Sequence, residues 1–579
     1  MAKTFIFFKK NWVILTILLV GGLLRVIYAF APTSQISPDE STYGLAALHW
    51  VKGTDFPIFY YAQPYTGTLS AIISAGLMAV FGITPFWLKI VPLLCSVAFV
   101  YTNYLLGKKI FKREAVGLLA ALFTALCSPF FLNWSGRAGS GYPEMILIGN
   151  LSLLLILKIL YPEVREAQDP VSLKKRDRVL LVRYQNYAIL GLLLGLGFWI
   201  QPSIVYYAVP VLLLLLLFKP WLFFTLPGWL LILGAVLGCS PVIYYNIVYH
   251  GATSLALFHD PWGIKNAASS FWTVGFPIIA GLRASWTTAD FFKPLSILIY
   301  LFYFAAGYWL FFSLIVKFLW EGTVGWSLSI FKKSISFIFC LAHRLRSCLS
   351  KRPSLVGTDE SGSGVAFGAK LVTRTSLWSQ ELARLIDPAW LIWGVLFFTW
   401  LIFSLSGQFG QFVIEPRYIL SLYTVLPLLA AGFIIKASLV FSAIRYFLIL
   451  LVLASQLIGL ALGGKNTRPD TFLNQYSLKP LINFLDSRDI GFVYADEEIC
   501  HRLIFESNER IICTPITDCF TTNRYPAYKE MVINADKKNL AYVRAPGRTY
   551  HTQECLSDLN LQTDPCHFEQ IGEFGIYSY

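Results

Sequence analysis

The stretch that decides the fold lies near the N-terminus, where KKNWVILTILLVGGLLRVIYAFA occupies residues 9–31. Its apolar part, residues 11–31, has the length of about 20 residues that a helix needs to span a bilayer core. Residues 29–31 resemble a signal-peptidase site, but Arg25 inside the run and Pro32 directly after it argue against cleavage. Because two lysines precede the run, we expect a retained helix with a cytoplasmic N-terminus.

Similar apolar runs recur along the chain and predict a polytopic α-helical membrane protein. Of its 579 residues, 56% are hydrophobic and 14% are charged, whereas soluble domains average about 25% charged residues. Residues 465–579 hold 12 basic and 16 acidic side chains, so residues 1–464 carry a net charge of +18. That excess lies in short loops between the apolar runs, mainly in every second loop and therefore on the cytoplasmic side, as the positive-inside rule expects. This distribution argues against nucleic acid as the partner. About eleven spans follow, near 11–31, 84–107, 115–132, 143–161, 187–201, 203–218, 228–248, 291–316, 389–406, 416–435 and 440–462.

The charge pattern also predicts two domains. A transmembrane domain, residues 1–464, contains a first outer loop at 32–83 and a cytoplasmic loop at 318–388. Within the outer loop, Thr68–Gly82 is apolar but short, and we expect a helix lying at the membrane interface. The cytoplasmic loop is rich in Ser, Gly, Lys and Arg, which predicts partial disorder and no nucleotide site.

Residues 465–579 have a soluble composition and predict a small extracytoplasmic α/β domain. Strands are expected at 491–494, 510–515 and 540–543, and a helix at 496–507. The domain contains five cysteines, which allow up to two disulfides without fixing their pairing; they are Cys500, Cys513, Cys519, Cys555 and Cys566. No CxxC spacing or histidine grouping favours a metal there.

The first outer loop contains SPDESTYG at residues 37–44. Ser37 followed by Glu40 predicts a capping box, with Pro38 at the first helical position. This purely structural interpretation explains the acidic pair on its own. The alternative is that Asp39 is a general base at the membrane surface, with Glu40 beside it in the catalytic pair. Tyr43 would share a helical face with Asp39 and is a candidate for binding the substrate.

Other polar residues on the outer side are candidates for binding a substrate. Gln63 and Tyr65, in an aromatic turn, could hydrogen-bond a sugar or merely occupy the interface. Outer cations could stabilise a departing phosphate, and the sparse candidates are Arg137, Lys265, Arg283 and Arg417. For these cations, snorkelling, local ion pairing or topology is the structural alternative.

The chain resembles the GT-C glycosyltransferases, and within them family 39, the protein mannosyltransferase and aminoarabinose transferase-like group. Four stretches in the same order and sidedness carry the likeness, besides the outer-loop Asp-Glu pair; they are LGKKIFKRE (106–114), GLLLGLGFWIQPSIVYYAVP (191–210), LGCSPVIYYN (237–246) and EPRYILSLYTVLPLLAAG (415–432). The resemblance implies a polyprenyl-phosphate sugar as donor, inverting transfer of a hexosyl or pentosyl group, and Asp39 as base. Gln63-Pro64 stands where the family often has His-Pro.

From the sequence we therefore expect a glycosyltransferase in the plasma membrane, acting on a lipid, glycan or protein hydroxyl outside the cytoplasm. No obligatory cofactor or metal is predicted, and a divalent cation is left open. The main alternative is a transporter or lipid flippase with Asp39 as a coupling carboxylate. Against it, the ionisable residues gather at the outer surface, whereas transport sites favour the midplane. A non-catalytic scaffold is a third alternative.

Overall fold

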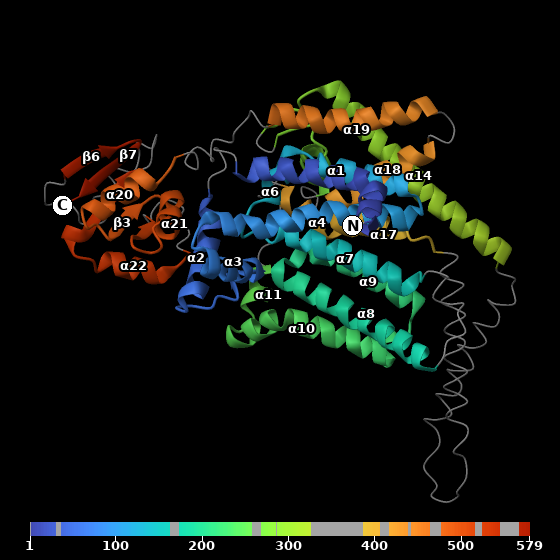
Figure 1. The fold of residues 1–579 in the computed structure, drawn as a ribbon, viewed down its shortest axis with the longest axis horizontal. Coiled ribbons are helices and arrows are strands. Elements are labelled where there is room, and N and C mark those ends of the chain that lie inside the picture. The colour runs from blue at the N-terminus through green and yellow to red at the C-terminus, as the bar shows by residue number, and fades with distance from the viewer. Residues whose placement is uncertain are drawn as a thin grey trace, which may run out of the picture.

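The computed structural model describes a helical body with a small sheet domain at one end (Figure 1). Residues 326–385 of the predicted cytoplasmic loop, Lys265, Cys519, Cys555 and Cys566 lie outside the described residues. The described ranges are 2–30, 36–162, 173–257, 268–284, 287–325, 386–405, 416–437, 442–463, 476–515, 524–544 and 567–578.

The helical body follows the predicted apolar runs. Its helices are α1 (Ala2–Phe30), α2 (Pro38–Lys52), α3 (Leu69–Phe81), α4 (Pro85–Phe111), α5 (Glu114–Ala125), α6 (Pro129–Ser135), α7 (Tyr142–Leu160), α8 (Leu173–Ile200), α9 (Val205–Phe218), α10 (Leu226–Val248), α11 (Ala252–Leu257), α13 (Phe276–Ile279), α14 (Lys293–Gly325), α17 (Trp390–Leu405), α18 (Leu422–Ala437) and α19 (Ser442–Gly463). Short turns join them at η2 (Pro202–Ile204), η3 (Leu222–Phe224), η4 (Phe271–Gly275) and η6 (Pro416–Ile419).

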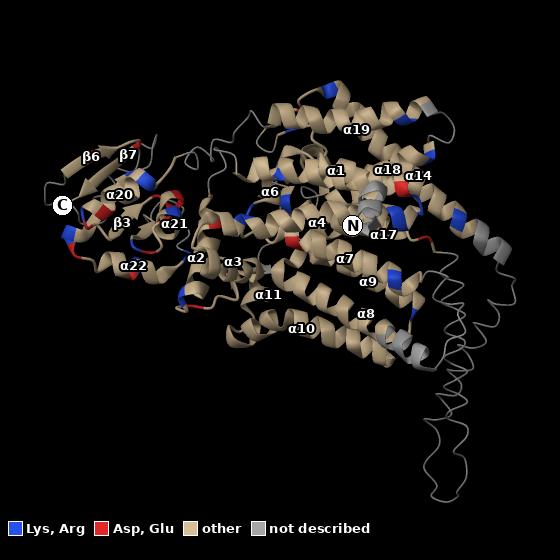
Figure 2. Cartoon of the chain, viewed as in Figure 1, with Lys and Arg blue, Asp and Glu red and all other residues tan. Residues whose placement is uncertain are grey.

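A helix occupies each of the eleven predicted spans, except that a bent pair occupies 115–132. Among the described residues, six helices are long and apolar enough to cross a membrane, or up to seven when the bent pair is counted as one. The others are shorter apolar helices, so eleven crossings remain a prediction. Figure 2 shows the helices almost without charged residues along their length, as hydrocarbon requires.

The bent pair corrects the single span predicted at 115–132, because α5 and α6 meet at 82°. Arg25 of α1 is fully buried at this break. Its guanidinium donates to the carbonyl oxygens of Thr124 (3.0 Å) and Ala125 (3.2 Å), and to the Ser96 hydroxyl (2.7 Å). Carbonyl groups at a helix end have no partner within the helix, so Arg25 satisfies the end of α5 and stabilises the bend.

Helices α8 and α10 pack closely through glycines, as the GxxxG spacing at Gly191 and Gly195 predicts. A Cβ atom on Gly191 would collide with the Leu231 carbonyl oxygen of α10, and one on Gly195 with that of Ala235. The close approach of the two helix backbones therefore depends on glycine, which has no Cβ atom, at these two positions.

We expect Gly191→Ala to lower the midpoint of thermal unfolding, at a cost of about 1–3 kcal/mol from overpacking. Alanine ordinarily stabilises a helix relative to glycine, by roughly 0.5–1 kcal/mol. A matched control is Gly76→Ala in α3, where a Cβ atom meets nothing within 4 Å. Thermal unfolding in detergent, followed by tryptophan fluorescence, should give opposite signs for the two variants. Stabilisation by both would contradict the packing described.

The C-terminal domain is a five-stranded sheet with strand order β4-β3-β5-β7-β6. Strand β3 (Phe492–Ala495) pairs in parallel with β4 (Ile512–Pro515) and β5 (Leu540–Arg544), which confirms the three predicted strands. The predicted helix is α21 (Glu497–Glu506), and the Cys500–Cys513 disulfide joins it to β4. The sequence did not predict α20 (Lys479–Ser487), α22 (Pro526–Ile533) or the antiparallel strands β6 (His567–Ile571) and β7 (Phe574–Ser578).

Candidate active site

The first loop is organised by the predicted capping box at the start of α2. The Ser37 hydroxyl accepts from the Glu40 backbone N–H (3.2 Å), and the Glu40 carboxylate accepts from that of Ser37 (2.9 Å). The second Glu40 oxygen accepts from the Ala138 N–H (3.2 Å), and Lys89 lies 3.9 Å from it. Glu40 is buried. One of the two predicted catalytic carboxylates thus occupies a structural position, where it ties α2 to the turn between α6 and α7.

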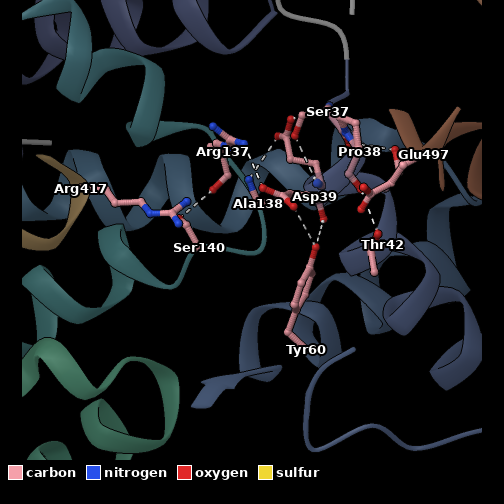
Figure 3. A network of polar contacts seen from close by, with 12 residues as sticks. Ser37, Pro38, Asp39, Thr42, Tyr60, Arg137, Ala138, Ser140, Arg417 and Glu497 are labelled. Carbon is pink, nitrogen blue, oxygen red and sulfur yellow. Dashed lines mark hydrogen bonds and ion pairs between the residues drawn. The ribbon is translucent and has the colours of Figure 1, made fainter. Parts of the chain in front are cut away.

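Asp39 points elsewhere, and its side chain is 38% exposed. Figure 3 shows it among residues from several parts of the chain. One carboxylate oxygen lies 3.2 Å from the Arg137 guanidinium, in the turn after α6. The other lies 2.8 Å from Arg524 of the C-terminal domain, and the Tyr60 hydroxyl donates to it at 3.3 Å. Tyr60 belongs to β1 (Phe59–Tyr60), a short strand of the first loop.

These contacts fix the charge of Asp39. Burial acts to raise the pKa of its carboxyl, but the guanidinium groups of Arg137, Arg524 and Arg417 outweigh that effect, and the Tyr60 hydrogen bond adds to theirs. The pKa of Asp39 therefore lies below its ordinary value, and the side chain is a carboxylate at neutral pH. Burial and the Asp39 charge raise the pKa of Tyr60 well above its ordinary value, so Tyr60 remains a hydrogen-bond donor.

Two of the predicted cations share one indole ring. The Arg137 guanidinium lies 4.7 Å from the centre of the Trp134 ring, and the Arg417 guanidinium lies 5.8 Å from it. Arg417 also lies 5.2 Å from the Tyr418 ring. With Arg524, three guanidinium groups thus act on the Asp39 carboxylate, and Glu497 is a second acidic side chain near them, 3.6 Å from Arg524. This local excess of positive charge suits a site that binds an anion.

Two predicted sugar-binding residues lie in β2 (Gln63–Gly67), which pairs with β1, and both are partly exposed. Gln63 lies opposite Tyr60 in the strand register. Burial raises the pKa of the Tyr65 hydroxyl, which also lies close enough to Arg417, Arg524 and Asp39 for their charges to act on it. Both positions thus border the surroundings of Asp39.

Tyr43, the third residue predicted to bind substrate, is buried within the loop. Its hydroxyl donates to the Gly67 carbonyl oxygen (3.2 Å) and accepts from the Ala71 N–H (3.2 Å). These bonds join α2 to the β2–α3 connection. The contacts give Tyr43 a structural role in shaping the loop.

Arg283 is not brought to Asp39 by any contact within the described ranges. It pairs with Asp290 at 2.7 Å and donates to the Thr273 carbonyl oxygen in η4 (3.1 Å). Element η4 packs against η6, which carries Arg417. Arg283 is therefore linked to Arg417 only through the packing of η4 against η6.

Arg524 is not among the site residues predicted from the sequence. It lies in a domain of net negative charge, far from the first loop in the chain, and no motif surrounds it. The only local signal is Pro526, which opens α22 and places Arg524 in the turn before that helix. As for metals, no group of three or more His, Cys, Asp or Glu side chains that could hold an ion occurs among the residues the structure describes.

The C-terminal domain docks along α2 beside this site. Midway along the helix, Gly44 leaves room for Phe505 of α21, whose ring a Cβ atom would strike. At the far end, Glu509 accepts from Lys52 (2.6 Å) and lies 2.8 Å from the His49 ring. Tyr528 also bonds Glu509. The domain is thus held midway along α2 and at its far end.

We expect Glu509→Gln to weaken this docking in a pH-dependent way. Burial acts to raise the pKa of Glu509, but hydrogen bonds from His49, Lys52 and Tyr528 lower it from 4.5 to about 2. The contribution of the carboxylate to stability, about 3 kcal/mol, is complete above pH 4.5 and is lost as pH falls towards 2. Thermal unfolding of wild type and variant should therefore differ at neutral pH, and the difference should shrink with acidification. A difference independent of pH would contradict the prediction.

The architecture matches solved membrane proteins. ArnT from Cupriavidus metallidurans in the apo state aligns over 98% of both chains, with a TM-score of 0.52 and 12% sequence identity. The chain has the fold of ArnT. ArnT bound to undecaprenyl phosphate aligns over the same shares with a TM-score of 0.49. The archaeal oligosaccharyltransferase AglB from Archaeoglobus fulgidus, in complex with an inhibitory peptide and a dolichol-phosphate, gives a TM-score of 0.43 at 15% identity, over 99% of this chain and 74% of AglB. No protein-family model matches the sequence, and no curated protein does.

Proposed function

We propose that the chain is a membrane glycosyltransferase that moves a sugar from a polyprenyl-phosphate donor to an acceptor hydroxyl, with inversion. The observation that carries the proposal is the Asp39 carboxylate facing the guanidinium groups of Arg137, Arg417 and Arg524. A base beside an excess of positive charge is what displacement of a phosphate requires. The shared fold supports it, because ArnT has been solved with undecaprenyl phosphate bound.

In the proposed reaction, Asp39 takes the proton of the acceptor hydroxyl as that oxygen bonds to the anomeric carbon. The bond from the anomeric carbon to the phosphate oxygen breaks, and the polyprenyl phosphate leaves. The phosphate carries one negative charge in the bound donor and two after departure. Arg137 and Arg417 would bind it and stabilise the second charge.

The lowered pKa of Asp39 makes it a weak base in the resting site, although it guarantees the ionised form. A phosphate between the guanidinium groups would offset their charge, and the carboxylate would regain basicity. Binding of the donor would thus prepare the base. In this scheme Gln63 and Tyr65 contact the sugar, and Arg283 has no assigned part.

The same proposal places residues 1–464 in the membrane and residues 465–579 outside the cytoplasm, with the N-terminus cytoplasmic. The acceptor is a hydroxyl of a lipid, glycan or protein at the outer face of the plasma membrane. We retain the family 39 resemblance as a prediction and require no metal.

The test is sugar transfer in detergent solution, with purified full-length protein and a panel of labelled polyprenyl-phosphate sugars. We expect release of polyprenyl phosphate and a glycoside of inverted anomeric configuration. Detergent abolishes the two compartments, so a flippase would consume no donor. Donor that stays intact with every sugar and acceptor in the panel would count against the proposal and favour the transporter interpretation. A product of retained configuration would exclude the single-displacement step.

A further inference from the structure

The contact between Arg524 and Asp39 joins the C-terminal domain to the first loop. Besides its bond to the Asp39 carboxylate, Arg524 lies 5.0 Å from the centre of the Tyr60 ring and 3.6 Å from a carboxylate oxygen of Glu497. The side chain is 15% exposed. Arg524 is thus enclosed by the loop on one side and by the start of α21 on the other.

Packing around Arg524 fixes where its guanidinium lies. The turn that carries it leads into α22, which packs against β4 and β3. Helix α21, tied to β4 by the Cys500–Cys513 disulfide, lies along α2 and presses Phe505 onto Gly44. The docked domain therefore presents Arg524 to Asp39 through two helices that are both held against the same sheet.

We propose that Arg524 is a positioning residue, through which the docked C-terminal domain orients the Asp39 carboxylate and keeps it ionised. The inference rests on the proposed function of Asp39 as the base. It gives the C-terminal domain a part in the reaction itself, in addition to any contact it makes with the acceptor.

Several groups face Asp39 besides Arg524, and they determine how far the pKa of Asp39 should change when Arg524 is replaced. Arg137 comes from the turn before α7, and Arg417 from η6; the hydroxyl groups of Tyr60 and Tyr65 come from the loop. Glu497, on α21, lies behind Arg524. Without Arg524, two guanidinium groups remain, so the Asp39 pKa should rise but stay below the value it would have with no guanidinium group nearby. One oxygen also loses its charged partner and its fixed direction.

The first measurement needs no substrate. Carbodiimide activates protonated carboxyl groups, so labelling with an amine, quantified by peptide mass spectrometry, reports protonation of Asp39 in the purified full-length chain. At a fixed, mildly acidic pH, we expect labelling of Asp39 to increase about tenfold in Arg524→Gln, which corresponds to one pKa unit. Asp489, which is exposed on the C-terminal domain, is the internal reference for labelling.

Two variants are matched controls. Arg524→Lys keeps the positive charge and should restore labelling close to the wild-type level. Arg488→Gln removes another arginine of the C-terminal domain, which pairs with Glu569 at the surface, and should change nothing. Equal labelling of Asp39 in wild type and Arg524→Gln would overturn the proposal. An equal increase in Arg524→Gln and Arg524→Lys would overturn it too, because that result would report looser packing only.

The second measurement is the pH dependence of kcat for transfer. With Arg524→Gln, we expect the acid limb to move to higher pH by about one unit, whereas a merely structural loss would lower kcat without moving the limb. If wild type transfers sugar but the acid limb of Arg524→Gln lies at the wild-type pH, the proposed function stands and the role of Arg524 is overturned. Changed labelling without transfer from any donor would instead remove Asp39 as a base, and the inference with it.

Discussion

Replacing Asp39 with asparagine is expected to lower kcat for sugar transfer by about a hundredfold to ten-thousandfold, the usual contribution of a general base. Asparagine keeps the shape of the side chain but cannot accept the proton of the acceptor hydroxyl. It also removes the charge that pairs with Arg137 and Arg524. We therefore expect donor affinity to be kept or increased, because the Arg137 guanidinium becomes free to bind the phosphate.

Asp55→Asn is the matched control for this variant. Asp55 lies in the same loop, but it accepts a hydrogen bond from Tyr61 and makes no contact with Asp39 among the described residues. Asp55→Asn should retain kcat. Retention of rate by Asp39→Asn, with folding matched by thermal unfolding, would leave the reaction class open but exclude Asp39 as its base. The kcat/KM of wild type, which reports the free enzyme, should also persist below the ordinary pKa of an aspartate, because the pKa of Asp39 is lowered before the donor binds. Protonation would silence the base only at still lower pH.

Replacing Arg417 with glutamine is expected to lower kcat by about a hundredfold, the size of loss found when one donor to a developing oxyanion is removed. The guanidinium is positioned by the Trp134 and Tyr418 rings. Its charge should matter most when the phosphate gains its second negative charge, so kcat should fall more than KM rises. Steady-state kinetics over a range of donor concentrations would separate the two effects.

Arg283→Gln provides the comparison, because Arg283 is a predicted outer cation that pairs with Asp290. Its kcat should stay within a few-fold of wild type. If Arg283→Gln and Arg417→Gln lose activity equally, the phosphate site extends beyond Arg137 and Arg417. If neither loses activity, the phosphate lies elsewhere.

Local physics explains what the sequence could predict. Apolar runs become helices because hydrocarbon offers no partner to a free N–H or C=O group, and the Ser37–Glu40 spacing predicted a cap that the structure confirms. The cap also explains why two adjacent carboxylates differ, since Glu40 bonds backbone N–H groups while Asp39 faces Arg137 and Arg524. The short turn between α6 and α7 singled out Arg137, which does reach Asp39.

The remaining features depend on contacts between distant parts of the chain. The sequence predicts one straight span where the structure bends after α5. Pro129, the first residue of α6, is a local signal for a break. Nothing near it in the sequence shows that Arg25 bonds the carbonyl groups freed at the end of α5. The sequence of the β6–β7 hairpin shows only weak alternation of apolar and polar residues, because β6 lies at the edge of the sheet and is largely exposed. Arg524 acquires its partner only when the sheet domain docks on α2.

The separation between Asp39 and Arg524 is 485 positions. During synthesis the first loop is made and its flanking spans are inserted long before the ribosome reaches residue 524. Every nascent chain therefore carries an incomplete site for most of its elongation time. Donor lipid in the surrounding bilayer would meet a carboxylate held by fewer cations than in the finished protein. A premature stop upstream of residue 524 would leave an inserted helical body in that state permanently, so normal insertion would be no guide to activity.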